Sequence, residues 1–387
     1  TMDVAPVPGK NLTLSLDIEL QALAERLLEN KIGSVVAIEP STGEVLCMAS
    51  SPTFDPQMLV GRKRGENHHL LSQDKQKPLL NRAIMGTYPP GSTFKTSQAL
   101  TYLQEGIITP ETQFPCALGF RHKGLHVGCH AHSSPIALAP SLATSCNSYY
   151  CWGLYRMIGA DKYGSSQAAL TCWKDHMVAM GFGYRLGIDL PGEARGFIPN
   201  SAFYDKWYGK RWNGLTIVSI SIGQGEVTLT PLQIANLGAT IANRGYYITP
   251  HIVKSIEGES IDSLYTTPKY TMVEKRHYET VVQGMREAVL NGTCAAANLP
   301  DIEVCGKTGT AQNKGKDHSA FMGFAPMNDP KIAVAVYVEN GGFGAVYGVP
   351  IGALIMERYL TGTLSEESEK KATNIQQRTI YYGNQER

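Results

Sequence analysis

The sequence predicts an α/β protein in which a sheet lobe is built from both ends of the chain and a large, mostly helical lobe is inserted into it. Three observations support this fold class. Two short apolar runs joined by a tight turn lie near the start of the 387-residue chain, and three strand-like runs lie near its end. Between them, over residues 70–290, helical periodicity dominates and strand signals are few.

The first predicted elements are a strand and a helix. Leucines alternate with polar residues over 12–16, as in a half-buried strand. Asp17 is a good helix N-cap, and the apolar residues of 18–28 recur at helical spacing. We therefore expect a helix that starts after Asp17 and ends before Gly33.

Five strands make up the predicted sheet. Residues 34–38 and 44–49 flank Glu-Pro-Ser-Thr-Gly, a pattern typical of a β-hairpin with a short turn. The end of the chain supplies three further strands and then a helix, over 302–310, 319–325, 332–339 and 350–359.

These elements predict one domain over residues 1–360. Its sheet lobe occupies about 11–60 and 300–360, and its helical lobe about 70–295. The clearest helices of the inserted lobe cover 92–103, 231–242 and 274–290. A ligand cleft is expected between the lobes. Residues 361–387 are polar and charged with little periodicity, and we expect them to form a surface tail.

Composition and charge exclude several classes of protein. Lys plus Arg number 35 and Asp plus Glu 34, and this net charge of +1 argues against nucleic-acid binding and against a polybasic membrane-surface protein. With 43% hydrophobic residues, the chain has the composition of a folded protein. The longest apolar run, Ile332–Val338, is far shorter than the roughly 18 residues of a membrane-spanning helix.

The segment Tyr88-Pro-Pro-Gly-Ser-Thr-Phe-Lys95 contains the first candidate catalytic pair. Two prolines and a glycine predict a turn that starts a helix, with Ser92 at its N-terminus. Lys95 follows three residues later, so the two side chains share a helix face. A lysine in a cleft near other cations can lose its proton and then accept one from a serine hydroxyl. The alternative is a serine N-cap followed by a surface lysine, which the pattern alone does not exclude.

Two further motifs strengthen the catalytic interpretation. Ser145-Cys-Asn147 supplies a hydroxyl and an amide on a turn of the helical lobe, and Lys307-Thr-Gly-Thr310 lies on a predicted strand of the sheet lobe. Gly309 would leave room for a ligand against that strand. Each motif alone is equally typical of a turn or a strand end, but their order and their placement on two lobes are jointly specific.

In this order the three motifs resemble the signature of the penicillin-recognising serine transferases and hydrolases. Longer segments resemble class B high-molecular-mass penicillin-binding proteins, and in particular their elongation-type members; these segments are Tyr88–Lys95, Gly223–Ile234 and Cys305–Gln312. The resemblance runs from about Asn11 to Tyr359 and implies the penicillin-binding transpeptidase and serine β-lactamase-like fold. The chain departs from it in carrying Cys146 at the middle position of the second motif, which varies in the family. The pedestal domain and membrane anchor that such proteins have are expected upstream of Thr1.

The resemblance implies a peptidoglycan D,D-transpeptidase that cross-links stem peptides through a serine acyl-enzyme and is acylated by β-lactams. The resemblance implies that Ser92 attacks the carbonyl of the penultimate D-Ala and that Lys95 acts as the general base for this attack. The backbone N–H groups of Ser92 and Thr310 would form the oxyanion hole. An amine of a neighbouring stem peptide then attacks the acyl-enzyme and completes the cross-link.

The same resemblance implies roles for the remaining motif residues. Ser145 would pass a proton to the departing D-Ala amine, assisted by the charge of Lys307. Asn147 would hold the amide of the donor peptide. The hydroxyls of Thr308 and Thr310 would bind its terminal carboxylate.

Residues 114–132 contain two cysteines and four histidines. Thiolates and imidazoles at this density are typical of tetrahedral zinc sites, and the elongation-type proteins include members with a zinc site in this region. The candidate ligands of a structural zinc ion are Cys116, Cys129, His130 and His132. A Cys116–Cys129 disulfide and a set of unpaired surface histidines are the alternatives. The chemistry itself requires no cofactor.

Three other functions remain alternatives on the same fold: a β-lactamase, a D,D-carboxypeptidase and a β-lactam-sensing receptor domain. β-Lactamases need a group that activates the deacylating water, and no clear acidic loop lies between the second and third motifs. The resemblance also implies a SEDS-type glycosyltransferase and an elongation scaffold as partners. It implies the periplasmic face of the bacterial cytoplasmic membrane as the location, with an anchor expected upstream of Thr1.

Overall fold

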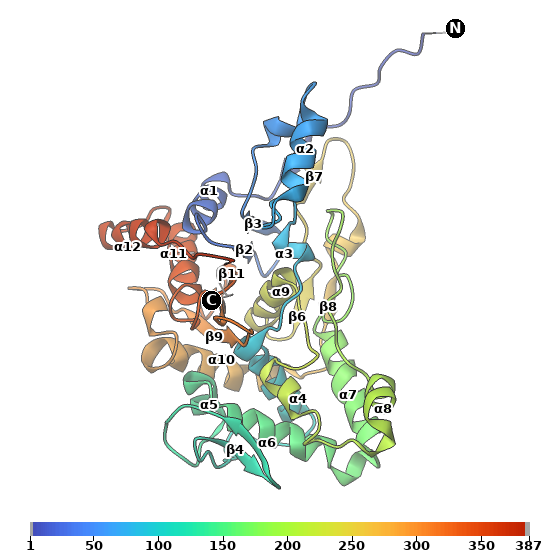
Figure 1. Cartoon of the computed structure of the whole chain (residues 1–387), viewed down its shortest axis with the longest axis vertical. Coiled ribbons are helices and arrows are strands. Elements are labelled where there is room, and N and C mark those ends of the chain that lie inside the picture. Colours follow the sequence, from blue (N-terminus) through green and yellow to red (C-terminus); the bar gives the residue numbers. More distant parts are fainter. Residues whose placement is uncertain (1–2, 384–387) are drawn as a thin grey trace.

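The computed structural model of the chain describes residues 3–383. Its centre is a five-stranded antiparallel sheet in the order β3-β2-β11-β10-β9, which confirms the predicted sheet. Two strands come from the start of the chain and three from its end, and Figure 1 shows them side by side. The bounds of these strands are β2 Gly33–Ile38, β3 Val45–Ser51, β9 Cys305–Ala311, β10 His318–Ala325 and β11 Ile332–Val338.

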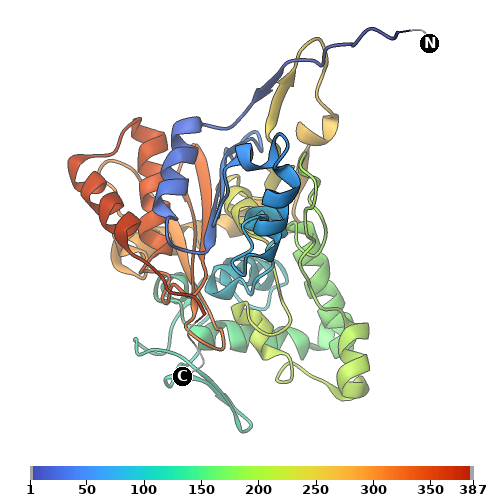
Figure 2. The same cartoon turned by 45° about the horizontal axis from the view of Figure 1, so that its top comes forward.

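Both faces of this sheet are buried. Successive side chains of each strand point to opposite sides of the sheet, so each strand contributes to two cores. In β2, for example, Val35 and Ala37 pack into one core, whereas Val36 and Ile38 pack into the other. Helices α1 (Ile18–Leu27) and α11 (Gly348–Thr361) cover the first face (Figure 2). Asp17 caps α1 as predicted, since its carboxylate accepts the N–H groups of Glu19 and Leu20.

Helix α9 (Pro231–Ala242) covers the other face, against β2, β10 and β11. All of its residues are buried, because it lies between the sheet and the rest of the inserted lobe. Thr230 and Gln233 form a capping box at its start, which satisfies two backbone N–H groups inside the protein. The sheet and the helical lobe therefore share one continuous core.

The inserted lobe is mostly helical, as predicted. Its helices are α2 Arg64–Gln73, α3 Arg82–Met85, α4 Lys95–Gln104, α5 Leu138–Thr144, α6 Asn147–Ile158, α7 Ser166–Ala179, α8 Ser201–Tyr208, α9 and α10 Lys275–Asn291. Two small ribbons interrupt it: β4 (Gly119–His122) pairs with β5 (Leu125–Gly128), and β6 (Tyr246–Ile248) with β8 (Pro268–Tyr270).

Two segments differ from the sequence-based expectation. The predicted strand at 12–16 is present as β1 (Leu12–Leu14), but it pairs with β7 (Val253–Ile256) in an arm outside the main sheet. Residues 366–377, expected within a surface tail, form helix α12, which packs on α1 and α11. Ala372 and Ile375 are buried there, and two apolar side chains three positions apart gave too weak a periodic signal to predict this helix.

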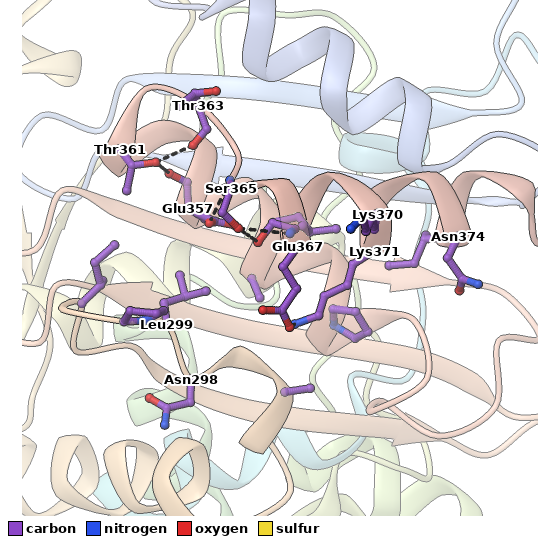
Figure 3. A pocket seen from close by; sticks show the side chains of 18 of the residues that line it. Asn298, Leu299, Glu357, Thr361, Thr363, Ser365, Glu367, Lys370, Lys371 and Asn374 are labelled. Carbon is purple, nitrogen blue, oxygen red and sulfur yellow. Dashed lines mark hydrogen bonds and ion pairs between the residues drawn. The ribbon is translucent and has the colours of Figure 1, made fainter.

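A cavity of about 840 Å³ lies between α11, α12 and the loop of residues 296–302 (Figure 3). Leu299, Ile302, Ala353 and Leu354 contribute to its apolar lining. None of the motif residues lines this cavity, and no residue of the five-stranded sheet does. Within residues 3–383, no helix combines the length and the apolar character needed to cross a membrane.

Candidate active site

The first motif forms a tight turn that leads into α4. Pro90 precedes a 3₁₀ turn over Gly91–Phe94, and the α-helix starts at Lys95. Ser92 is half-buried in this turn, whereas Lys95 is fully buried. The sequence-based expectation that the turn places both side chains at the start of a helix is met by this geometry.

The ammonium group of Lys95 faces the second motif. Its Nζ donates to the carbonyl oxygen of Ser145 at 2.9 Å, to Ser145 Oγ at 3.1 Å and to Asn147 Oδ1 at 2.7 Å. The ring of Tyr150 lies 5.6 Å from Nζ. Burial lowers the pKa of Lys95 to about 8, because the charged form loses its hydration. A substantial fraction of Lys95 is then neutral near physiological pH and able to accept a proton.

The second motif lies between two helices. Ser145 ends α5 in a left-handed conformation, with φ 59° and ψ 50°, and α6 starts at Asn147. Lys307 Nζ donates to Ser145 Oγ at 2.9 Å, so this hydroxyl oxygen accepts hydrogen bonds from two lysines. Burial, and then the charge of Lys95, hold the pKa of Lys307 well below its usual value. With its lone pairs occupied in this way, the Ser145 hydroxyl is left with its own proton to donate.

The third motif lies on β9, an edge strand of the sheet, where alternate backbone groups have no partner strand. Both threonine hydroxyls have partners within the protein. Thr308 Oγ1 donates to Thr293 Oγ1 at 2.9 Å, and Thr310 Oγ1 accepts the N–H of Gly344 at 3.3 Å. The sequence analysis did not find Thr293, since nothing at the end of α10 distinguishes it from an ordinary loop residue.

Glycines hold the first and third motifs together. A Cβ on Gly309 would lie 3.1 Å from Pro90 O and 3.1 Å from Thr93 Cγ2, so this glycine packs against the Ser92 turn. The sequence analysis instead attributed to it room for a ligand. On the other side of the turn, the N–H of Gly91 donates to Gly223 O at 3.0 Å. The turn that carries Ser92 is thus held between β9 and the loop at Gly223.

Three side chains of the predicted metal region and the thiol of Cys146 gather beside Asn147. Cys116, Cys129, His132 and Cys146 each offer one ligand atom, and these atoms lie within 4.8 Å of one another. Cys129 Sγ is 3.5 Å from His132 Nε2 and accepts the N–H of Asn147 at 3.4 Å. The pKa of Cys129 is lowered to about 4, mainly because the Cys146 thiol donates a hydrogen bond to the Cys129 sulfur.

This cluster differs from the predicted ligand set in one member. His130 is exposed and lies outside the four, and Cys146 takes its place. The sequence analysis treated Cys146 only as the variable position of the second motif. The thiols of Cys116 and Cys129 are free, so the alternative disulfide is not formed in this structure.

The donor set fits a tetrahedral zinc ion, which is bound in proteins by combinations of four thiolates and imidazoles. His132 Nε2 faces the cluster, and its Nδ1 lies 2.8 Å from the carbonyl oxygen of Ser133. A hydrogen bond at the second ring nitrogen is typical of a metal-bound histidine, because it fixes the tautomer.

The family of the chain follows from comparison with known proteins. Residues 33–357 match the penicillin binding protein transpeptidase domain, and this range includes every motif residue described above. The chain belongs to this family. The peptidoglycan D,D-transpeptidase MrdA of Acinetobacter baumannii is 34% identical to this transpeptidase domain over 364 residues, which cover 88% of the chain and 52% of that protein. The chain thus spans about half the length of this curated relative.

Solved structures confirm the fold of the transpeptidase domain. Pseudomonas aeruginosa PBP2 in complex with WCK 5153 superposes with a TM-score of 0.82 at 32% identity, over 94% of this chain and 79% of that one. A chain of a peptidoglycan synthase complex superposes with a TM-score of 0.80 at 32% identity, over 94% of this chain and 65% of that one. The ceftriaxone acyl-enzyme complex of penicillin-binding protein A from M. tuberculosis superposes with a TM-score of 0.76 at 26% identity, over 90% of this chain and 80% of that one.

The close contact behind the Ser92 turn leads to a stability prediction. A Cβ on Gly223, at φ +71°, would lie 2.1 Å from the carbonyl oxygen of Gly91. Gly223→Ala is therefore expected to lower the free energy of unfolding by about 3 kcal/mol, from backbone strain and overpacking together. Gly164→Ala is the matched control, because its φ is +79° with no atom within 4 Å, and it should cost only about 1 kcal/mol. Equal losses in urea unfolding would contradict this account of the contact.

Proposed function

We propose that this transpeptidase domain is a serine-type peptidoglycan D,D-transpeptidase that cross-links stem peptides and is acylated by β-lactams. The observation that carries the proposal is the convergence of Lys95 and Lys307 on the Ser145 hydroxyl. Lys95 follows Ser92 by three residues, and Lys307 lies on the edge strand β9. The name of the A. baumannii relative supports the reaction, and the M. tuberculosis acyl-enzyme complex supports acylation by a β-lactam.

The proposed reaction begins at Ser92. Its Oγ attacks the carbonyl carbon of the penultimate D-Ala, and neutral Lys95 accepts the hydroxyl proton. The oxygen of the tetrahedral intermediate takes up negative charge, which the backbone N–H groups of Ser92 and Thr310 stabilise. When the C–N bond breaks, Ser145 gives its proton to the departing D-Ala amine and takes up the proton that Lys95 received from Ser92. Lys307 keeps the Ser145 oxygen in an electropositive environment during this transfer.

Cross-linking follows by the reverse path. The amine of a second stem peptide attacks the ester carbonyl, gives up a proton to the Ser145–Lys95 relay, and displaces Ser92 Oγ, which is protonated again. Asn147 has its Nδ2 hydrogen-bonded to Gly128 O, at 2.8 Å, and its Oδ1 bonded to Lys95. Its amide is thereby fixed beside the cleft, which supports a role in holding the donor peptide.

A feature of the site favours transfer over hydrolysis. No carboxylate of residues 3–383 forms a hydrogen bond or ion pair with Lys95, Lys307 or Ser145. A β-lactamase needs a base that activates water against the acyl-enzyme. A long-lived acyl-enzyme, available to an amine, is the expected consequence.

Partners and location are proposed from the relatives. The structural match to a chain of a peptidoglycan synthase complex, in which polymerisation and cross-linking are coordinated, supports an association with a polymerising enzyme. We propose that this enzyme is a SEDS-type glycosyltransferase and that an elongation scaffold is a further partner. We place the domain on the periplasmic face of the cytoplasmic membrane, where stem peptides are cross-linked.

We further propose a structural zinc ion held by Cys116, Cys129, Cys146 and His132. Such an ion would supply no chemistry to the reaction and would cross-link three separate segments of the helical lobe. Cys146 is the middle residue of the second motif, and Cys129 accepts the N–H of Asn147. The ligands therefore support the backbone that presents Ser145 and Asn147 to the cleft.

Penicillin labelling tests the proposed function. A fluorescent penicillin should form a covalent adduct of one ligand per chain that lasts for many minutes, and peptide mapping should place it on Ser92. Ser92→Ala should abolish the adduct, whereas Ser97→Ala, a buried serine of α4 whose hydroxyl bonds Phe94 O, should retain it. Turnover of many penicillin molecules per second would instead identify a β-lactamase.

The pKa of Lys95 sets the pH dependence of acylation. The base must be neutral, so the acylation rate should rise with pH and level off above a midpoint of about 8. Below the midpoint the rate should fall about tenfold per pH unit, as expected for a single titrating base. Lys95→Arg keeps the positive charge but cannot act as a base, and its acylation should be lost. Near-normal acylation of this variant would show that another group removes the proton.

Metal analysis tests the zinc proposal. Protein purified without a histidine tag should contain about one zinc ion per chain, bound by the three cysteines and His132. Cys146→Ser and His132→Ala should lose the metal and melt at lower temperature, because metal binding energy contributes to folding. His130→Ala is the matched control and should keep both. Metal-free protein with a Cys116–Cys129 disulfide in a peptide map would overturn the proposal.

A further inference from the structure

Helix α8 and the turn after it expose an unusual run of side chains. Residues 206–211 read Lys-Trp-Tyr-Gly-Lys-Arg, and all of them are exposed. Trp207 keeps 66% of its surface accessible and Tyr208 49%, although large aromatic side chains are normally buried in a protein of this size. We call Lys206, Trp207, Tyr208, Lys210 and Arg211 the α8 patch.

The protein beneath the α8 patch is well packed. Tyr204 is fully buried and its hydroxyl donates to Glu226 Oε2 at 2.8 Å. Trp212 is also buried, and its Nε1 donates to Asp205 Oδ1 at 2.8 Å. Two tryptophans five positions apart thus have opposite environments. Trp207 is exposed because α8 packs against the protein through its opposite face, which carries Tyr204.

The cations of the patch are not neutralised. Asp205 is the acidic residue within α8, and its carboxylate is engaged by Trp212 and Gln167. No ion pair of the described residues involves Lys206, Lys210 or Arg211. The patch therefore combines two exposed aromatic faces with three free positive charges on a chain whose net charge is only +1.

The patch is connected to the active site through one loop. Glu226, the partner of Tyr204, lies three residues after Gly223, which accepts the Gly91 N–H beside Ser92. Phe197, just before α8, forms a β-bridge with Thr228 of the same loop. Figures 1 and 2 both show α8 at the outer end of the helical lobe, away from the β1–β7 arm.

We propose that the α8 patch binds a peptidoglycan strand beside the catalytic cleft. Flat aromatic faces pack against the C–H faces of N-acetylated sugar rings, and the three cations match the carboxylates of the stem peptides. This inference rests on the proposed function, since that reaction acts on an anionic polymer of this chemistry. A neutral glycan or an uncharged peptide would leave the cations without partners.

Co-sedimentation with purified peptidoglycan sacculi tests the proposal. Replacing Trp207 and Tyr208 by Ala, or Lys210 and Arg211 by Glu, should each weaken binding at least about fivefold, a loss typical of central contact residues. Binding of the unaltered chain should also weaken with salt. Tyr270→Ala, at a tyrosine 72% exposed on β8, and Lys370→Glu on α12 are the matched controls and should bind normally. Thermal unfolding of each variant verifies that it is folded.

Tryptophan fluorescence supplies a second measurement. Trp207 is the most exposed tryptophan, so soluble disaccharide–peptide fragments should shift its emission to shorter wavelength, and Trp207→Phe should remove the shift. Sacculus binding that is equal in all variants would overturn the proposal. Patch-dependent binding to vesicles of anionic phospholipid, without binding to sacculi, would also overturn it and identify a membrane contact instead.

The two proposals fail in different ways. Absence of a penicillin adduct on the unaltered chain would refute the proposed function. The sacculus measurement does not depend on acylation, because Ser92→Ala should bind sacculi as the unaltered chain does. Loss of sacculus binding in Ser92→Ala, with binding kept in the Trp207 and Tyr208 variant, would place the strand contact in the catalytic cleft and refute the α8 patch.

Discussion

Two buried lysines, carried by different lobes, donate to the same hydroxyl group. Lys95 comes from α4, Lys307 from the edge strand β9, and Ser145 lies between them on the turn from α5 to α6. Both ammonium groups lose hydration, and the charge of Lys95 further disfavours the charged form of Lys307. Within residues 3–383, no carboxylate forms an ion pair or hydrogen bond with either lysine. Such an arrangement is unfavourable in isolation, so the surrounding fold must hold it. Most other features of the site follow from that requirement.

The interface between the lobes is built to keep these groups in place. The Ser92 turn is packed on one side by Gly309 of β9 and bonded on the other to Gly223. Close backbone contact of this kind leaves little freedom for β9 to move relative to α4. Helix α9, buried between the sheet and the inserted lobe, joins both into one core. The cost of burying two cations is offset by this apolar burial, which involves many more side chains than the polar site.

The thiol cluster and the α8 patch both lie on the helical lobe and are each connected to a motif of the site. Cys146 belongs to the second motif, and Cys129 Sγ accepts the N–H of Asn147, so the cluster stabilises the turn at Ser145. Tyr204 and Glu226 connect α8 to the loop behind the Ser92 turn. The inserted lobe thus supports the catalytic groups and also presents an outer surface suited to the polymer.

The sequence by itself determined the sheet, the cap of α1, three helices of the inserted lobe (α4, α9 and α10) and the positions of the three motifs. These features depend on neighbours a few positions apart, such as alternating apolar residues or a proline-glycine turn before Ser92, and such patterns are visible along the chain. Tertiary structure alone decided which side chains meet. Ser145 and Lys307 are 162 positions apart, and Cys146 joins Cys116 and Cys129 only because α6 starts beside the β4–β5 ribbon. The exposure of Trp207, the burial of Trp212 and the packing of α12 were likewise decided by the elements that lie against them. Contacts of this kind depend on the positions of whole elements in space, which no local pattern encodes.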